Sequence, residues 1–199
     1  VNTYGATKLL MERLFVSANF YKGYHKTKFV CVRYGNVLGS RGSIIPIFTN
    51  QIKSGKTITI TDPNMTRFTI TMNEALALIF RALKHGNGGE IFIPKLSAYR
   101  VGDIKDALLN LFESSNQTEI ISIRAGEKIH ESLISNDELQ NTYEINEDYV
   151  IIDKQLKDSG YLDNNKITTS KLNEQYSSDK VEILSIDKLK ELLIKEKLI

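Results

Sequence analysis

The chain has 199 residues, of which 41% are hydrophobic and 25% charged, and its formal net charge is +2. This composition is ordinary for a globular protein and excludes a nucleic-acid protein that binds by bulk basicity. Its single cysteine, Cys31, excludes an internal disulfide and a metal site built from several cysteines. No apolar run reaches the roughly 20 residues of a membrane span, and no signal peptide is apparent, so we expect a cytoplasmic protein.

Hydrophobic periodicity predicts helices and strands in alternation along the chain. A helix is predicted from about Tyr4 to Tyr21, with an apolar stripe made of Leu9, Leu10, Leu14, Phe15 and Ala18. The run 28–33 is rich in β-branched residues and predicts a buried parallel strand, which completes half of a βαβ unit. Further helices are predicted over 44–52, 72–85, 101–112 and 185–198. Further strands are predicted over 57–61, 90–93 and 119–123, with a weaker one over 144–152.

Two of these helices carry start signals. Thr71, with Glu74 three residues later, fits a capping box before the helix over 72–85. The residues expected on the buried face of that helix are Ala75, Leu76, Leu78, Ile79 and Leu83. Ser185 is the expected cap of the last helix. The polar stretch 153–180 is expected to form a long loop or a poorly ordered segment.

Tyr4 and Lys8 are the first candidates for chemistry. They are spaced i, i+4 on the first predicted helix, so their side chains lie on the same face. An ammonium held beside a phenol favours the phenolate, which can then exchange protons with a substrate at neutral pH. The same spacing arises by chance, so a half-buried tyrosine beside a solvated lysine is the alternative.

The stretch 33–43 follows the predicted strand over 28–33 and is expected to form a loop. Ligands bind at the carboxyl ends of parallel strands in open α/β sheets. Asn36 offers an amide with both a donor and an acceptor, and Arg41 offers a forked cation for phosphate or carboxylate. The alternative is a structural turn with a surface arginine.

Four stretches stand in a recognisable order: Tyr4-x-x-x-Lys8, Arg33-Tyr34-Gly35-Asn36-Val37, the run 61–68, and the run 124–131 that begins with Arg124-Ala125-Gly126-Glu127. Together they resemble the polysaccharide-biosynthesis branch of the extended short-chain dehydrogenase/reductases, which modify nucleotide sugars. Within that branch they look most like the inverting UDP-N-acetylglucosamine 4,6-dehydratases. The run 58–68 looks equally like the sister UDP-sugar 4-epimerases.

The resemblance implies an α/β fold: the C-terminal part of a Rossmann-like doubly wound parallel sheet plus a smaller α/β substrate-binding lobe. We expect 1–60 to complete the dinucleotide-binding domain, 61–152 to form mainly the substrate lobe, and 153–199 to form a polar segment and terminal helix. No Gly-x-Gly-x-x-Gly loop occurs in the chain. We therefore expect this loop, and the Thr-Asp-Lys stretch of the dehydratases, upstream of Val1, and expect the fragment alone to be inactive.

The resemblance also implies roles for individual residues. Tyr4 and Lys8 would be catalytic, and with Tyr34 they would contact the cofactor, NADP with NAD as the alternative. Arg67 and Arg124 would bind the diphosphate of a UDP-sugar with help from Asn36 and Arg41, and Glu127 would accept hydrogen bonds from the uridine ribose. The three histidines, His25, His85 and His130, are expected not to bind a metal.

These assignments describe a lyase that assembles as a homo-oligomer in its full-length form, with no nucleic-acid or membrane partner. Two alternatives remain at this point. The first is the 4-epimerase, which shares the oxidation step. The second belongs to another class: a binding module that keeps the fold without the chemistry.

Overall fold

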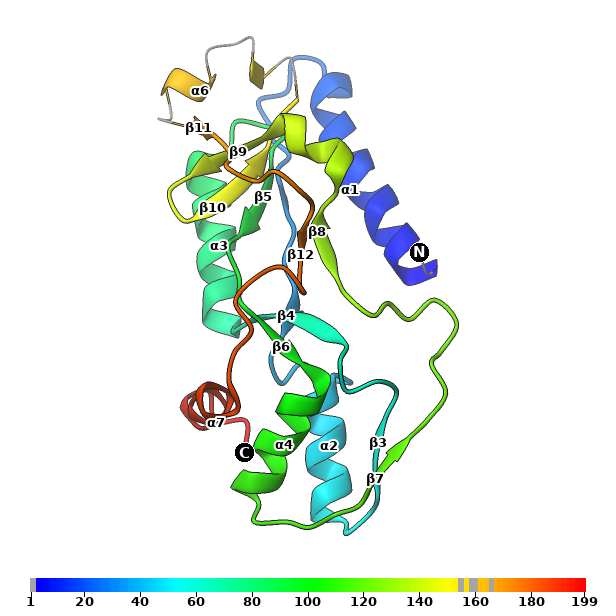
Figure 1. Cartoon of the computed structure of the whole chain (residues 1–199). Coiled ribbons are helices and arrows are strands. Elements are labelled where there is room, and N and C mark those ends of the chain that lie inside the picture. Colours follow the sequence, from blue (N-terminus) through cyan, green and yellow to red (C-terminus); the bar gives the residue numbers. More distant parts are fainter. Residues whose placement is uncertain (1–2, 154–155, 158–160, 165–166) are drawn as a thin grey trace. The chain divides into compact units, whose positions relative to one another are not determined.

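The computed structural model describes residues 3–153, 156–157, 161–164 and 167–199 (Figure 1). The chain forms two compact units, each assembled from separate stretches of sequence. Unit 1 consists of Val1–Tyr34, Asn73–Lys95 and Ser132–Tyr176, and unit 2 consists of Gly35–Met72, Leu96–Glu131 and Ser177–Ile199. The domain boundaries expected at residues 60 and 152 stay a prediction.

Unit 1 is organised around a five-stranded sheet in the order β1-β5-β10-β9-β11. β1 and β5 run parallel, and the other neighbours are antiparallel. The strands are β1 (Cys31–Val32), β5 (Ile91–Pro94), β9 (Thr142–Ile145), β10 (Asp148–Ile151) and β11 (Thr168–Thr169). The other elements are α1 (Thr3–Tyr21), α3 (Met72–His85), β8 (Ser132–Ile134), the 3-10 helix η1 (Asn136–Asn141), α6 (Tyr161–Asn164) and β12 (Tyr176–Ser177).

One face of α3 packs against this sheet through buried apolar side chains. Leu78 and Ala82 of the helix join Phe92 of β5 and Val150 of β10 in one hydrophobic cluster, which forms the core of unit 1. All four side chains are at most 1% exposed. The cluster explains why the apolar residues of this helix recur at a spacing of three to four.

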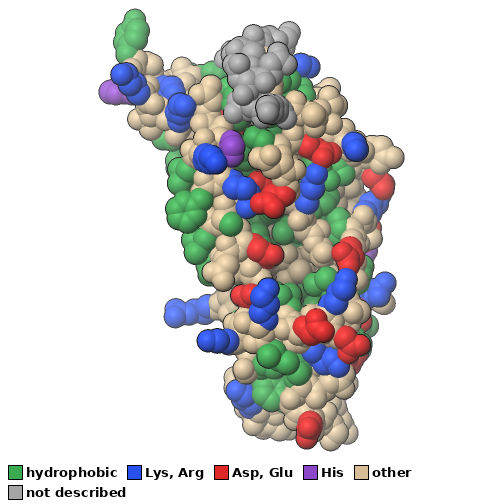
Figure 2. All heavy atoms as spheres, turned by 90° about the vertical axis from the view of Figure 1, so that its left-hand side faces the viewer, with side chains coloured by type: hydrophobic (Ala, Val, Ile, Leu, Met, Phe, Trp, Pro, Cys, Tyr) green, Lys and Arg blue, Asp and Glu red, His purple; other side chains and the backbone are tan. Residues whose placement is uncertain are grey.

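The outer face of α3 differs from the sequence prediction. Ala75 and Leu78 are buried as predicted, but Leu76 and Leu83 are 45% and 68% exposed. Only one side of the helix meets the sheet, so apolar residues further round the helix remain at the surface. Figure 2 views the chain from the side on which α3 lies in Figure 1, and hydrophobic side chains are visible there.

Helix α1 agrees with its predicted bounds, and its apolar stripe lies at the surface. None of its described residues is buried, and Leu9, Leu10 and Leu14 are 50%, 61% and 62% exposed. Phe15 does approach Phe29 after the helix, with ring centroids 6.0 Å apart. The apolar stripe of α1 is therefore an open surface, because no described element covers it.

The weak strand predicted over 144–152 is a hairpin of β9 and β10, in which Tyr149 lies opposite Glu144. Asn146 in the turn has φ 53°, a left-handed conformation that asparagine tolerates better than most residues. A tight turn without glycine or proline leaves only a weak signal in a sequence. The polar stretch 153–180 includes α6, β11 and β12, and its residues 154–155, 158–160 and 165–166 lie outside the described residues.

Unit 2 contains a three-stranded sheet, β2-β4-β6, and a parallel pair, β3-β7. The strands are β2 (Asn36–Val37), β3 (Ile58–Ile60), β4 (Thr66–Ile70), β6 (Ala98–Arg100) and β7 (Thr118–Ile120). The helices are α2 (Ile44–Lys53), α4 (Val101–Leu111) and α7 (Ile186–Lys195). The sequence did not predict β2, β4 or β6 as strands, because short strands show too little alternation.

The three helices of unit 2 enclose its core. Phe48 of α2, Leu108 of α4 and Leu189 of α7 belong to one hydrophobic cluster and are at most 3% exposed. Helices α2 and α4 lie side by side in Figure 1. Ser185 caps α7, since its side chain accepts a hydrogen bond from the Lys188 backbone N–H at 3.4 Å. That prediction is confirmed.

Candidate functional site

The first candidate residues lie on the N-terminal half of α1, in unit 1. Lys8 Nζ is 5.3 Å from the centroid of the Tyr4 ring, so the two side chains share one face of the helix. Tyr4 is 71% exposed, and Tyr34, which follows β1, is 37% exposed. The structure therefore places an ammonium over a phenol ring on an open helix face, where both groups can reach a bound ligand.

The second group of candidates surrounds a cavity of about 180 Å³ in unit 2. Asn36 from β2, Arg67 from β4 and Tyr99 from β6 line it. Strand pairing brings them together, because β2 pairs in parallel with β4, and β4 pairs antiparallel with β6, with Arg67 directly opposite Tyr99. Burial raises the pKa of Tyr99 to about 12, so this phenol stays neutral.

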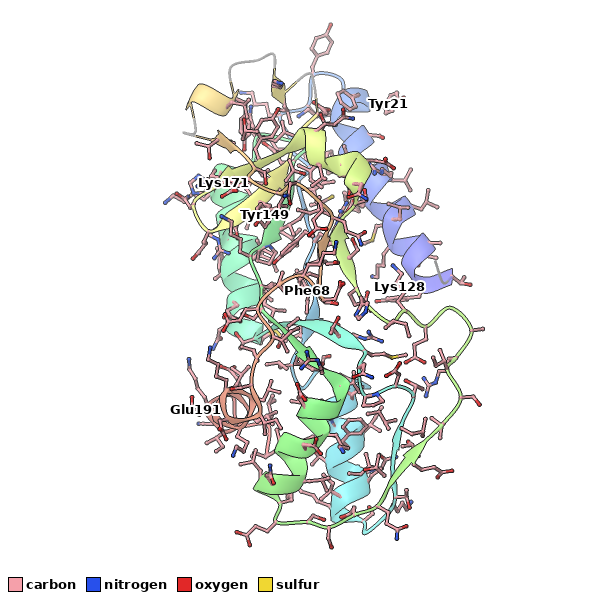
Figure 3. The ribbon with its side chains drawn as sticks, in the orientation of Figure 1. Tyr21, Phe68, Lys128, Tyr149, Lys171 and Glu191 are labelled. Atoms are coloured by element: carbon pink, nitrogen blue, oxygen red, sulfur yellow. The ribbon has the colours of Figure 1, made fainter. Side chains whose placement is uncertain are left out.

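The approach of β2 to β4 depends on a glycine. A Cβ atom added at Gly35 would overlap the side chain of Phe68 on β4. Phe68, which is fully buried, is labelled in Figure 3. The glycine of the 33–37 stretch therefore has a packing reason: only a residue without a side chain lets Asn36 reach the cavity from the neighbouring strand.

The N-terminal end of α2 also borders this cavity. Its N-cap and first two residues line the cavity: Ser43, Ile44 and Ile45. Ser43 is the N-cap residue, but its side chain makes no capping hydrogen bond. Among the described residues its buried Oγ has no hydrogen-bond partner. Backbone N–H groups at a helix N-terminus attract anions. The cavity thus combines a guanidinium, an amide and a helix end, all of which bind phosphate.

Arg67 is held in one orientation by its neighbours. Its Nη1 donates hydrogen bonds to the carbonyl oxygens of Thr66 at 2.8 Å and Ile129 at 3.0 Å. Glu131 Oε1 lies 3.7 Å from its Nε, and Glu127 Oε1 lies 4.0 Å from its Nη2. Because the side chain is only 13% exposed, these contacts fix the direction of its guanidinium before any ligand binds.

Glu127 also fixes the loop that carries Arg124. Its Oε2 accepts a hydrogen bond from the Arg124 backbone N–H at 3.1 Å, and its Oε1 accepts one from Thr61 Oγ1 at 3.1 Å. Gly126 between them has φ 80°, which glycine adopts without strain. Lys128, labelled in Figure 3, marks this loop. Glu127 therefore connects Arg67, Arg124 and the end of β3.

Four of the five predicted substrate residues thus belong to one connected part of unit 2. Asn36 and Arg67 share a cavity, and Glu127 links Arg67 to Arg124. Arg41 is exposed on the turn before α2 and lies outside the cavity lining. Sequence reasoning missed Ser43 and Tyr99, because neither stands in a motif and Tyr99 sits on a strand of three residues.

Small polar side chains support β4 beside Arg67. Thr66 Oγ1 lies 2.8 Å from His130 Nδ1 and 2.6 Å from Ser178 Oγ. Ser178 Oγ also accepts a hydrogen bond of 2.9 Å from the Glu131 backbone N–H. Thr66 and Ser178 are buried. Sequence spacing did not indicate that these side chains meet, since His130 and Ser178 are 64 and 112 residues from Thr66.

The mixed α/β fold with parallel strand pairs recurs in solved structures below 25% identity, among them a UDP-glucose 4-epimerase from Thermotoga maritima and a dTDP-glucose 4,6-dehydratase from Streptomyces venezuelae. The expected fold class is confirmed. A family model described as "Polysaccharide biosynthesis protein" matches residues 1–153. The chain belongs to this family. Relatives of the chain carry the names of enzymes that modify nucleotide sugars.

Two relatives carry different activities in their names. The UDP-glucose 4-epimerase of Rickettsia rickettsii is 37% identical over 198 residues, which cover 98% of this chain and 57% of the relative. The UDP-N-acetylglucosamine 4,6-dehydratase (inverting) of Campylobacter jejuni is 46% identical over 153 residues, which cover 76% of this chain and 44% of the relative. The chain therefore spans about half the length of these relatives.

Among solved structures, that of Pen from Bacillus thuringiensis matches with a TM-score of 0.89 at 36% identity. The match covers 100% of this chain and 59% of that chain. More distant structures, below 25% identity, share the fold, and some of them hold NAD or NADPH.

Two features are absent from the described part of the chain. None of its helices is both long enough and apolar enough to cross a membrane. The same residues contain no group of three or more histidine, cysteine, aspartate or glutamate side chains arranged to hold a metal ion.

Proposed function

We propose that the longer protein containing this chain is an NADP-dependent UDP-N-acetylglucosamine 4,6-dehydratase of surface polysaccharide or pseudaminic acid synthesis. The observation that carries the proposal is the unit 2 cavity, where Arg67, Asn36 and the uncapped end of α2 converge. A diphosphate carries two negative charges, and a forked guanidinium and a helix N-terminus both favour such an anion. The 46% identity to the Campylobacter dehydratase supports the choice of reaction.

The geometry of the unit 2 cavity supports the following contacts with the nucleotide. We assign the diphosphate to Arg67 and Arg124, with the Asn36 amide as an additional donor and Arg41 as an outer cation. Glu127 accepts hydrogen bonds from the ribose hydroxyls once a nucleotide binds. Its present contacts with Thr61 and the Arg124 backbone support this role, because they hold the carboxylate in place.

We assign the chemistry to α1. Tyr4, as the phenolate, takes the proton from the sugar 4-hydroxyl. Lys8 stabilises that phenolate and would donate a hydrogen bond to the ribose of a bound nicotinamide cofactor, which Tyr34 would also contact. That cofactor would supply the redox chemistry of the reaction, taking up a hydride from C4 and giving it back at C6. The phenol and ammonium on one exposed face suit ribose hydroxyls, which both donate and accept hydrogen bonds.

Removal of water follows from the 4-ketone. The carbonyl acidifies the C5–H bond, so the C5 proton leaves, and the C6 hydroxyl departs with a proton as water. A hydride at C6 and a proton at C5 then complete the 4-keto-6-deoxy product. The balance is one water lost from the sugar with no net change in the cofactor. NADP is our first choice of cofactor and NAD the alternative, because related folds hold either type.

A 4-epimerase is the second candidate, and one observation favours it. The alignment with the Rickettsia epimerase runs over 198 residues, whereas that with the dehydratase runs over 153. An epimerase would share the oxidation at C4, with Tyr4 as the base, and would return the hydride to the other face of C4. A non-catalytic binding module is disfavoured, because such a module has no need for Tyr4, Lys8, Arg67 and Arg124 together.

The deciding experiment incubates the full-length protein and NADP with UDP-N-acetylglucosamine and follows the product by mass spectrometry. A dehydratase yields a sugar nucleotide lighter by one water. An epimerase yields an isomer of unchanged mass that separates by chromatography. Binding of the sugar nucleotide without either product would identify the binding module and refute both enzyme assignments.

Replacing Tyr4 with phenylalanine tests the proposed base. We expect kcat to fall at least about 100-fold, since positioned acid–base groups contribute roughly 10²–10⁴-fold, while UDP-sugar affinity stays unchanged. The matched control is Tyr21→Phe at the other end of α1, where the tyrosine is 86% exposed. Near-normal turnover by Tyr4→Phe would remove Tyr4 from this role.

A further inference from the structure

Arg33, which follows β1, has every donor of its guanidinium occupied. Nε and Nη2 donate to the two carboxylate oxygens of Glu12 at 2.9 and 2.6 Å. Nη1 and Nη2 each donate to Glu138 at 3.0 Å, and Nη1 also donates to the Leu133 carbonyl oxygen at 2.6 Å. An arginine has five N–H donors in a fixed fork, so this one is saturated. Its bonds join parts of the protein and leave no donor for a ligand.

The cluster formed by Arg33, Glu12 and Glu138 is largely shielded from water, and with Arg13 its charges are balanced. The side chains of Arg33, Glu12 and Glu138 are 19%, 12% and 15% exposed. Arg13, whose Nη2 lies 3.6 Å from Glu138 Oε1, supplies a second cation. Burial alone would lower the pKa of Arg33, but hydrogen bonds to Glu12 and Glu138 outweigh burial and raise that pKa above its usual range. Shielded, bidentate ion pairs of this kind fix geometry better than exposed pairs do.

Glu12 connects this cluster to the proposed catalytic pair. It follows Lys8 by four residues and Tyr4 by eight, so the three side chains rise along one side of α1. Figure 1 shows η1, the yellow-green helix before β9 that carries Glu138, beside the blue helix α1. Through Glu12, the cluster ties the chemistry-bearing side of α1 to both β1 and η1.

A further attachment of α1 lies nearer its C-terminal end. The Asn19 amide donates to the Phe29 carbonyl at 2.8 Å and accepts from the Phe29 N–H at 3.0 Å. Asn19 is seven residues beyond Glu12, which is about 10 Å along a helix. Because no described residue of α1 is buried, apolar packing does not fix the direction of its N-terminal half. The ion pair of Glu12 lies closer along α1 to Tyr4 and Lys8 than the Asn19 hydrogen bonds do.

We propose that Arg33 is a positioning residue: by holding Glu12 and Glu138 together it sets the N-terminal half of α1, and with it Tyr4 and Lys8, in the orientation the reaction requires. This inference rests on the proposed function for its catalytic consequence. The anchoring itself depends only on the contacts within unit 1.

Glu12→Gln in the full-length protein tests the proposal, since it removes the charge and keeps the side-chain volume. Amide hydrogen exchange should accelerate at least about tenfold over residues 4–12 and stay unchanged over 16–21. With UDP-N-acetylglucosamine, kcat should fall roughly 10- to 100-fold at unchanged KM, because misplaced catalytic groups slow chemistry without weakening substrate binding. The control is Asp137→Asn, which removes an exposed carboxylate next to Glu138 on η1 and should change neither readout.

The two readouts separate failure of this inference from failure of the proposed function. Exchange needs no substrate, so it tests the anchoring even if the wild-type protein converts no UDP-sugar. Unchanged exchange over 4–12 in Glu12→Gln would overturn the inference, as would an unchanged kcat or a higher KM with unchanged kcat. A uniform rise in exchange over all of α1 would show a general loss of stability and would also overturn it.

Discussion

The orientation of Arg67 depends on side chains and carbonyls from two stretches of unit 2. The backbone of Thr66 and Ile129 accepts its hydrogen bonds, and two glutamates lie at 3.7 and 4.0 Å. These neighbours occupy part of the guanidinium and leave it at the edge of the cavity. A guanidinium fixed in this way gives up little freedom when it binds an anion, and that is why we rank it above exposed Arg41.

Arg67→Ala should weaken binding of UDP to the full-length protein roughly 10- to 150-fold, because a hydrogen bond to a charged group contributes about 1.5–3 kcal/mol. Isothermal titration calorimetry measures the change. Arg100→Ala is the control, since Arg100 lies on the same unit with a side chain 53% exposed and one long ion pair to Asp103. Equal affinities for both variants would contradict the diphosphate assignment.

At the scale of elements, η1 shows how one side chain can serve two structures. Glu138 closes a capping box, in which its carboxylate accepts from the Ser135 N–H at 3.0 Å and from Ser135 Oγ at 3.1 Å. The same carboxylate receives the Arg33 fork. Burial alone would raise the pKa of Glu138, but the hydrogen bonds from Arg33 and Ser135 outweigh burial and hold that pKa below its usual range.

This shift predicts an acid dependence. Because the pKa of Glu138 is lower in the folded than in the unfolded protein, its ionisation stabilises the fold above the ordinary value of 4.5, and this contribution is lost as the pH falls through the folded pKa. Glu138→Gln should therefore unfold at lower urea concentration than wild type at neutral pH, with the difference shrinking on acidification. The control is Glu119→Gln on the exposed strand β7. A difference that stays constant with pH would refute the linkage.

At the scale of the whole chain, two hydrophobic clusters stabilise the fold, one in each unit. In unit 2 the cluster draws on α2, α4 and α7, which come from all three stretches of that unit. Short strands alone offer little apolar area, so these helices carry the burial that maintains the sheet around Arg67. The site therefore depends on residues that never touch a ligand.

Leu108→Ala should lower the free energy of unfolding by about 2–5 kcal/mol, the usual cost of a cavity at a fully buried leucine. Urea denaturation of the full-length protein measures it. Leu83→Ala on α3, where the leucine is 68% exposed, should cost less than about 1 kcal/mol. Equal losses for the two variants would show that the assigned core is wrong.

Local sequence patterns were sufficient to predict much of the secondary structure and many of the candidate site residues. The helices α1, α2, α4 and α7, the cap at Ser185 and the motif residues follow from spacing within a few positions, because helix periodicity and capping are short-range effects. The family and the fold class followed from the order of the motifs, and the family match over 1–153 agrees with both.

Only the tertiary structure decided which residues meet. The cavity joins Asn36 to Arg67 through strand pairing, and Arg33 reaches Glu12 and Glu138 across 21 and 105 residues of sequence. It also left the apolar stripe of α1 exposed, which helical spacing alone does not decide. Spacing along a chain records which side chains share a face, whereas the partner of that face is chosen by packing between distant segments.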